Sequence, residues 1–196
     1  PPPMAGLMVA MRQHYPKLTV RIRTTEDPIG SLERGVDAAM AIGVREPEGR
    51  WKSIEVARVE RRLVASPSYL ERTGVPDSVE TLAERDLLTW DAPDGSGNRL
   101  PIVSGGSLEV QPIVESPDIH LVRQLTAHGL GIAFTPDAGL PEPGLPLVPV
   151  MPDVVRDEVP VRIIVAAANE DRPRIRALLT EIYGLIAKLN PEMVKR

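Results

Sequence analysis

Residues Arg61–Pro76 (RRLVASPSYLERTGVP) predict a strand that ends where a helix begins. The apolar run at 63–65 is typical of a buried strand. Ser66 followed by Pro67 is the pattern of a helix N-cap with proline at the first helical position. Gly74 adopts positive φ at little cost, so the predicted helix of about two turns ends there.

Size and composition restrict the class of protein. The chain has 196 residues, of which 42% are hydrophobic, enough for one large domain or two small ones. A net charge of -4 supplies no basic surface for nucleic acid, so we expect contact with DNA only through a domain absent from this chain. The lack of cysteine agrees with a reducing compartment, and we expect a cytoplasmic protein. No stretch is long and apolar enough to span a bilayer, so we expect no membrane partner.

Outside the opening stretch, the hydrophobic period alternates between that of a strand and that of a helix. Amphipathic helices are predicted at both ends of the chain, at residues 4–15 and 173–189. Predicted strands comprise 18–22, 37–43, 54–65, 87–90, 131–134 and 159–168, with a hairpin formed by 100–103 and 108–114. We read 37–43 as a buried parallel strand and 141–152, with five prolines, as an irregular segment holding at most one short edge strand. The alternation predicts an α/β fold.

Four pairs of a capping residue and a proline come at or just after strand-like runs. These pairs are Asp27-Pro28, Ser66-Pro67, Ser116-Pro117 and Thr135-Pro136. If the strands are parallel, their carboxyl ends share one edge of a sheet, and helix starts there direct free N–H groups at a ligand. The pattern therefore indicates a cleft for a small anion. The alternative is that each pair is an ordinary helix cap in a proline-rich chain.

Other candidate sites are weaker. The histidines lack the spacing of metal ligands and no nucleophile stands beside a base, so we expect no metal, no cofactor and no enzyme activity. The arginines of the 58–62 stretch alternate with a glutamate, which favours a solvated strand face. Trp90, at the end of a predicted strand, is expected in the core or in the wall of a cleft.

Several of these segments resemble the effector-binding domain of LysR-type transcriptional regulators. The resemblance rests on the first amphipathic helix with residues 14–18 after it, on 35–43 (GVDAAMAIG), on 65–70 (ASPSYL) with 74–76, and on 129–136 (GLGIAFTP). It covers nearly the whole chain. It implies a periplasmic-binding-protein-like fold of type 2, in which two α/β subdomains are joined by two crossover strands.

The resemblance also implies a division of the chain and a site. The first subdomain would comprise 1–65 plus 160–196 and the second 66–159, with residues 61–76 as the first crossing and 159–168 as the return. The effector would bind in the cleft between them, at positions that the family uses for effector contacts: Pro3, Thr24, Thr25, Ser66, Ser116, Phe134 and Thr135. Pro1-Pro2-Pro3 stands where the family has its first strand, and Ser116-Pro117-Asp118 stands where many relatives have an asparagine-rich helix start.

The sequence thus predicts a ligand-sensing domain without catalytic activity. A small effector, a carboxylate or another anion, would bind between the subdomains of a homodimer or homotetramer and control DNA binding through a separate winged helix-turn-helix. The alternative is a solute-binding protein of a transport system, which has the same fold, a signal peptide and no DNA partner.

Overall fold

A computed structural model describes residues 3–93, 95–137 and 145–189. The chain divides into two compact units: unit 1 consists of Pro1–Arg58 and Pro160–Arg196, and unit 2 of Val59–Val159. The chain passes between the units twice, once within strand β2 (Trp51–Ala65) and once within strand β9 (Arg156–Ala166). The two crossover strands are therefore confirmed, and β2 is one long strand up to the Ser66 cap. The predicted first boundary, after residue 65, lies further along β2 than the division after Arg58.

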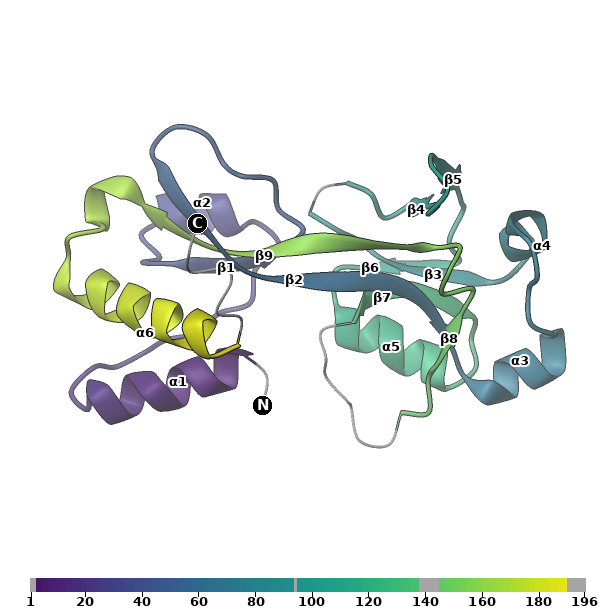
Figure 1. The fold of residues 1–196 in the computed structure, drawn as a ribbon, viewed down its shortest axis with the longest axis horizontal. Helices are drawn as coiled ribbons and strands as arrows, with labels where there is room; N and C mark the ends of the chain where they lie inside the picture. Colours follow the sequence, from purple (N-terminus) through teal and green to yellow (C-terminus); the bar gives the residue numbers. More distant parts are fainter. Residues whose placement is uncertain (1–2, 94, 138–144, 190–196) are drawn as a thin grey trace. The chain divides into compact units, whose positions relative to one another are not determined.

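Unit 1 packs helices on both faces of a small antiparallel sheet. Strand β1 (Ala39–Ile42) pairs with β9, Ala39 opposite Ile164, and β9 neighbours β2. Helices α1 (Pro3–His14) and α6 (Pro173–Leu189) lie side by side (Figure 1). They share a core on one face, and the short helix α2 (Pro28–Glu33) covers the other. The core members on the α1/α6 face include Leu7, Met11, Ile163, Val165, Ile175 and Leu179, and those under α2 include Leu32, Ala39 and Ile164.

Two predictions in unit 1 were wrong. Strand β1 is antiparallel to its neighbour, not parallel. Residues 18–22 are extended but lie outside every strand of the described chain, and Val20 and Ile22 are exposed. Alternation of apolar residues specifies which side chains share a face, but a strand also needs a neighbouring backbone to complete its hydrogen bonds.

Unit 2 contains a mixed sheet. Strands β3 (Leu87–Trp90) and β6 (Val114–Ser116) are parallel, and β7 (Ile132–Asp137) is parallel to β3. Strand β2 runs antiparallel to β7 and also pairs with the short β8 (Val148–Val150). The described part of the proline-rich segment thus holds the expected short strand, while 141–144 lie outside the described residues.

Helix α5 (Ile119–Ala127) covers one face of this sheet and the predicted hairpin covers the other. Val64, Leu88 and Val122 form the core beneath α5. Leu63, Leu87 and Phe134 point to the opposite face. They pack with residues of the hairpin, formed by β4 (Arg99–Pro101) and β5 (Ser107–Glu109).

The capping predictions divide into two confirmed and two wrong. Asp27 accepts from Gly30 N and starts α2, and Ser66 accepts from Tyr69 N and starts α3 (Pro67–Thr73), with Gly74 as its C-cap. Ser116, by contrast, ends β6, and the cap of α5 is Asp118. Thr135 and Pro136 lie within β7.

Strand β7 can include Pro136 because of where β3 ends. The last β3 residue paired with β7 is Thr89, opposite Phe134. Pro136 lies beyond that pair, so its missing N–H removes no hydrogen bond from the β3 ladder. A further helix, α4 (Val79–Ala83), starts at Ser78, whose side chain caps it by accepting from Thr81 N.

Candidate functional site

The ends of three parallel strands form one edge of the unit 2 sheet. Trp90 ends β3 opposite Ser116, which ends β6. Phe134 lies opposite Thr89, which places Thr135 beside the end of β3. We call this edge, with Trp90, Ser116 and Thr135, the carboxyl edge. It is the kind of edge at which open α/β sheets bind ligands.

Side chains at the carboxyl edge alternate between the two faces. Val114, Leu88 and Ala133 belong to the face covered by α5. Two residues further along each strand, Ser116, Trp90 and Thr135 lie on that same face. Trp90 is only 7% exposed and donates from Nε1 to the Pro117 carbonyl at 3.2 Å, so it is buried, as one of the two expected positions requires. Ser116 is partly exposed, whereas Thr135 is buried.

The start of α5 is already occupied by a carboxylate. Asp118 Oδ1 accepts from the backbone N–H of His120 at 2.9 Å and of Leu121 at 3.2 Å. Ser116 Oγ in turn accepts from Asp118 N at 3.1 Å. These N–H groups therefore already have an acceptor, and the Asp118 charge opposes a second anion beside them.

Ser66 lies at the opposite edge of the sheet. Because β2 is antiparallel to β7, Ala65 at its end pairs with Ile132 at the start of β7, while Thr135 pairs with Arg62. Ser66 is four residues along β2 from Arg62, about 13 Å in an extended chain. It is 1% exposed, and its Oγ accepts from Tyr69 N at 3.2 Å. In the described chain Ser66 acts as a helix cap and does not meet Ser116 or Thr135.

Phe134 points to the other face of the sheet, under Arg61. The Arg61 guanidinium lies 5.3 Å from the centre of the Phe134 ring. Arg61 is only 5% exposed, so the prediction of a solvated face was wrong for this residue. The signal was present in the sequence, because Arg61 precedes the buried Leu63 and Ala65 by two and four residues and must share their face.

In unit 1, Thr24 and Thr25 lie in the exposed loop before α2. Thr25 Oγ1 accepts from Asp27 N at 3.1 Å and from the Ser31 hydroxyl at 3.2 Å. Asp27 Oδ1 accepts from Gly30 N at 2.8 Å, so this helix start also carries a carboxylate. Pro3 is the first residue of α1.

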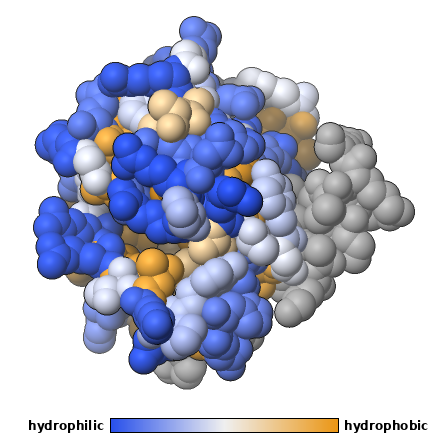
Figure 2. Space-filling view, turned by 90° about the vertical axis from the view of Figure 1, so that its left-hand side faces the viewer, coloured by the Kyte–Doolittle hydropathy of each residue, from blue (hydrophilic) through white to orange (hydrophobic). Residues whose placement is uncertain are grey.

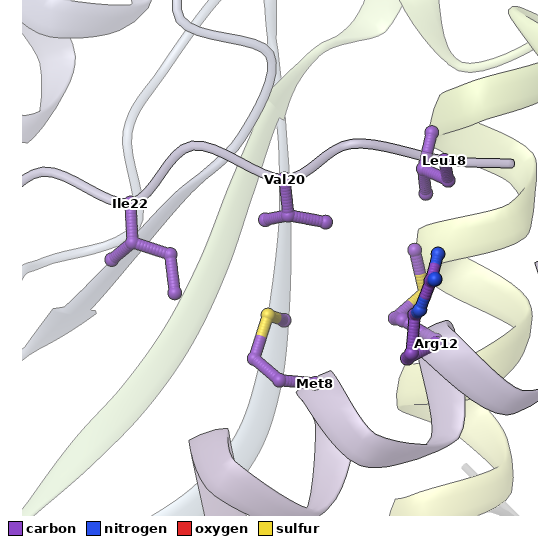
Figure 3. Close-up of a pocket in the computed structure, with 6 residues that line it drawn as sticks. Met8, Arg12, Leu18, Val20 and Ile22 are labelled. Carbon is purple, nitrogen blue, oxygen red and sulfur yellow. The ribbon is translucent and has the colours of Figure 1, made fainter. Parts of the chain in front are cut away.

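A hollow in unit 1 lies elsewhere. It has a volume of about 210 Å³ and is lined by Met8, Met11, Arg12, Leu18, Val20 and Ile22. In Figure 3, Val20 and Ile22 point from the extended segment toward Met8 of α1. Figure 2 shows one end of the molecule, where hydrophilic residues predominate and apolar residues form small patches between them. No predicted effector residue lines this hollow.

Residues 2–184 match the family model of the LysR substrate binding domain. The chain belongs to this family. It is 30% identical over 137 residues to the HTH-type transcriptional regulator CrgA of Neisseria meningitidis serogroup C, across 68% of this chain and 45% of that protein. It is 25% identical to the HTH-type transcriptional repressor PA14_22550 of Pseudomonas aeruginosa, across 97% of this chain and 63% of that protein. The chain thus spans about half to two thirds of the length of these curated relatives.

Solved structures agree with the fold. The regulatory domain of CrgA from Neisseria meningitidis, a LysR-type transcriptional regulator, superposes with a TM-score of 0.81 at 23% identity, over 95% of this chain and 92% of that one. The full-length Vibrio cholerae virulence activator AphB gives 0.74 at 21% identity, over 92% and 62% of the two chains. The predicted fold, of the type 2 periplasmic-binding-protein-like class, is confirmed. The relatives are named as transcriptional regulators, as expected for a domain that is not an enzyme.

In the part of the chain that the structure describes, no helix has both the length and the apolar character needed to cross a membrane. The same residues contain no cluster of three or more histidine, aspartate or glutamate side chains placed to hold a metal ion.

Proposed function

We propose that the chain is the ligand-sensing part of a LysR-type transcriptional regulator, and that its small effector binds in a cleft between the two units, at the carboxyl edge of unit 2. The observation that carries the proposal is the parallel arrangement of β3, β6 and β7, which brings Trp90, Ser116 and Thr135 to one edge. Thr24 and Thr25 would face the effector from unit 1, with Pro3 nearby. Phe134 would support the site from the opposite face of the sheet without contacting the effector. Ser66 would cap α3 and would not contact the effector either.

We further propose that the effector is a small anion, such as a carboxylate. Two helix starts are capped by Asp27 and Asp118, so their N–H groups are not free for it. The support for an anion is the pair of hydroxyl groups at Thr24 and Ser116, each a donor that can bond a carboxylate oxygen. The Thr25 hydroxyl donates to the Asp27 carbonyl at 3.2 Å and would have to exchange that bond for one to the effector. Hydroxyl groups, not helix dipoles, would then bind the effector.

The effector would regulate by favouring one arrangement of the protein. A ligand that binds two states equally shifts neither, so the effector must contact one state better than the other. In the complete regulator, a homodimer or homotetramer in the cytoplasm, this difference would pass to a separate winged helix-turn-helix that binds DNA. The name shared by the relatives, HTH-type regulators, supports this second domain.

Thermal unfolding of this chain with matched pairs of ligands tests the anion proposal. Benzoate is compared with benzamide and succinate with succinamide, because each pair differs mainly in charge. A carboxylate present at a hundred times its Kd should raise Tm by about 5–10 °C, and its amide should not. Equal shifts from acid and amide would refute an anionic effector, and no shift from any of the four would speak against this effector class.

A further inference from the structure

A buried ion pair in unit 2 joins the two strands by which the chain crosses between units. Arg61 of β2 bonds Asp157 of β9 through both carboxylate oxygens, Nε to Oδ1 at 2.8 Å and Nη2 to Oδ2 at 2.6 Å. The Arg61 side chain is 6% exposed and that of Asp157 29%. Such a pair adds little stability over apolar residues of the same size, because burial costs the charges their hydration. The pair can therefore serve a role other than stability.

The remaining contacts of Arg61 point to that role. Its Nη1 donates to Ser96 Oγ at 2.7 Å, and its guanidinium lies over the Phe134 ring. Ser96 belongs to the loop that follows β3 directly after Trp90. Residues 91–93 and 95–98 of this loop are described, and we call them the segment 91–98. Arg61 thus contacts three elements at once: β9, β7 and the segment that follows the end of β3. The planar fork of arginine can serve several partners in fixed directions, which a lysine cannot.

The segment 91–98 borders the carboxyl edge. Asp91 N donates to the Ser116 carbonyl at 2.9 Å. Gly97 is buried, and a side chain there would collide with the Glu115 carboxylate. The segment therefore packs against β6 at one side and is held by Arg61 at the other.

We propose that Arg61 is a positioning residue, which holds the segment 91–98 in place and thereby fixes the rim of the effector site. The role of the segment as the rim of the effector site rests on the proposed function, whereas its being held by Arg61 does not. Asp157 orients the guanidinium, and Ser96 of the segment accepts a hydrogen bond from it. Arg61 itself does not contact the effector.

A second ion pair on the same two strands provides a matched control. In unit 1, Arg162 of β9 bonds Glu55 of β2, Nη2 to Oε2 at 3.2 Å, with side chains 15% and 26% exposed. Its other hydrogen bond is to Ser53 Oγ, also on β2, at 3.4 Å. The Arg162 pair links the same two strands as the Arg61 pair. Unlike Arg61, however, Arg162 has both of its partners, Glu55 and Ser53, on β2.

Hydrogen exchange in the whole chain tests the positioning role. The reporters are the amides of Gly95 and Arg99, which donate to the Ala92 and Ser96 carbonyls at 2.9 and 3.0 Å. The double variant Arg61→Met/Asp157→Leu replaces the pair by apolar residues, which preserves folding, and should exchange at these amides about tenfold faster. Ser96→Ala should show the same effect to a smaller degree. The control Arg162→Met/Glu55→Leu should leave both amides unchanged.

Wild-type protection at Gly95 and Arg99 in the folded Arg61→Met/Asp157→Leu variant would overturn the proposal, as would equal loss of protection in the control. Binding separates the two proposals. If benzoate or succinate stabilises the wild type, the Arg61→Met/Asp157→Leu variant should bind it at least about fivefold more weakly. A fivefold loss of affinity corresponds to the net contribution of roughly one hydrogen bond. If neither binds the wild type, the proposed effector class fails, while the exchange rates still decide the role of Arg61.

Discussion

The two edges of the unit 2 sheet differ although the sequence marks both with the same dipeptide. At one edge, Ser66-Pro67 follows β2 and Ser66 caps α3. At the other, Ser116-Pro117 follows β6, but Asp118 caps α5 and Ser116 is partly exposed. The direction of the strand decides which edge a dipeptide reaches, and β2 runs against β7. A capping motif therefore predicts a helix start without telling whether it adjoins a site.

Under the proposed function, one edge has a structural role and the other binds the effector. Ser66 is buried and its hydroxyl bonds the start of its own helix. Trp90, Ser116 and the segment held by Arg61 line the other edge. Substitutions at the first edge should lower stability alone. Those at the second should alter binding.

The largest expected effect comes from breaking the ion pair beside the carboxyl edge. Arg61→Met leaves the Asp157 carboxylate without its bidentate partner and should lower the free energy of unfolding by about 3 kcal/mol. Adding Asp157→Leu should recover most of that loss. Urea denaturation of both variants measures the difference. A double variant as unstable as Arg61→Met would show that the unpaired Asp157 charge does not cause the loss of stability.

At the opposite edge, Ser66→Ala should lower the free energy of unfolding by about 1–2 kcal/mol. The substitution removes the capping hydroxyl, which is one of two acceptors of the Tyr69 N–H, and leaves only the Ser66 carbonyl at 3.1 Å. Ser66→Asn, which keeps a capping oxygen, should lose less. Urea denaturation measures both variants, and an unchanged midpoint for Ser66→Ala would refute the capping role.

A smaller effect is expected at the start of α5. Asp118→Ala removes the acceptor of two backbone N–H groups in an exposed position and should cost about 0.5–1 kcal/mol. It also removes a negative charge beside Ser116. If the effector is an anion, benzoate or succinate should bind this variant more tightly, whereas a weaker affinity would indicate a ligand that needs the carboxylate. Calorimetric titration gives the sign.

Much of the fold follows from the sequence, because local patterns and the family resemblance agree there. The apolar period of residues 175–189 needs only one packed face, and the run at 63–65 needs only a buried position. The errors arise where a distant partner decides the outcome. Residues 18–22 have a strand pattern but no strand beside them, and Pro136 lies within β7 because β3 ends before it.

The site was less predictable than the fold for the same reason. The sequence indicates hydroxyl groups at strand ends but not the antiparallel pairing of β2 with β7, which separates Ser66 from Ser116 and Thr135. The charges around Arg61 favour a solvated face, whereas its spacing from the buried Leu63 and Ala65 places it on their face. Its partner Asp157 lies 96 residues away along the chain, beyond the reach of any local pattern.

The most direct test of the account compares Ser116→Ala with Ser66→Ala in calorimetric titrations with whichever of benzoate and succinate stabilises the wild type more. Ser116→Ala should change the free energy of unfolding by less than about 0.5 kcal/mol, as partly exposed substitutions do, yet weaken binding about fivefold or more. Ser66→Ala should unfold more easily and bind with wild-type affinity at a temperature where it is folded. Weaker binding by Ser66→Ala together with wild-type binding by Ser116→Ala would contradict the assignment of the site to the carboxyl edge.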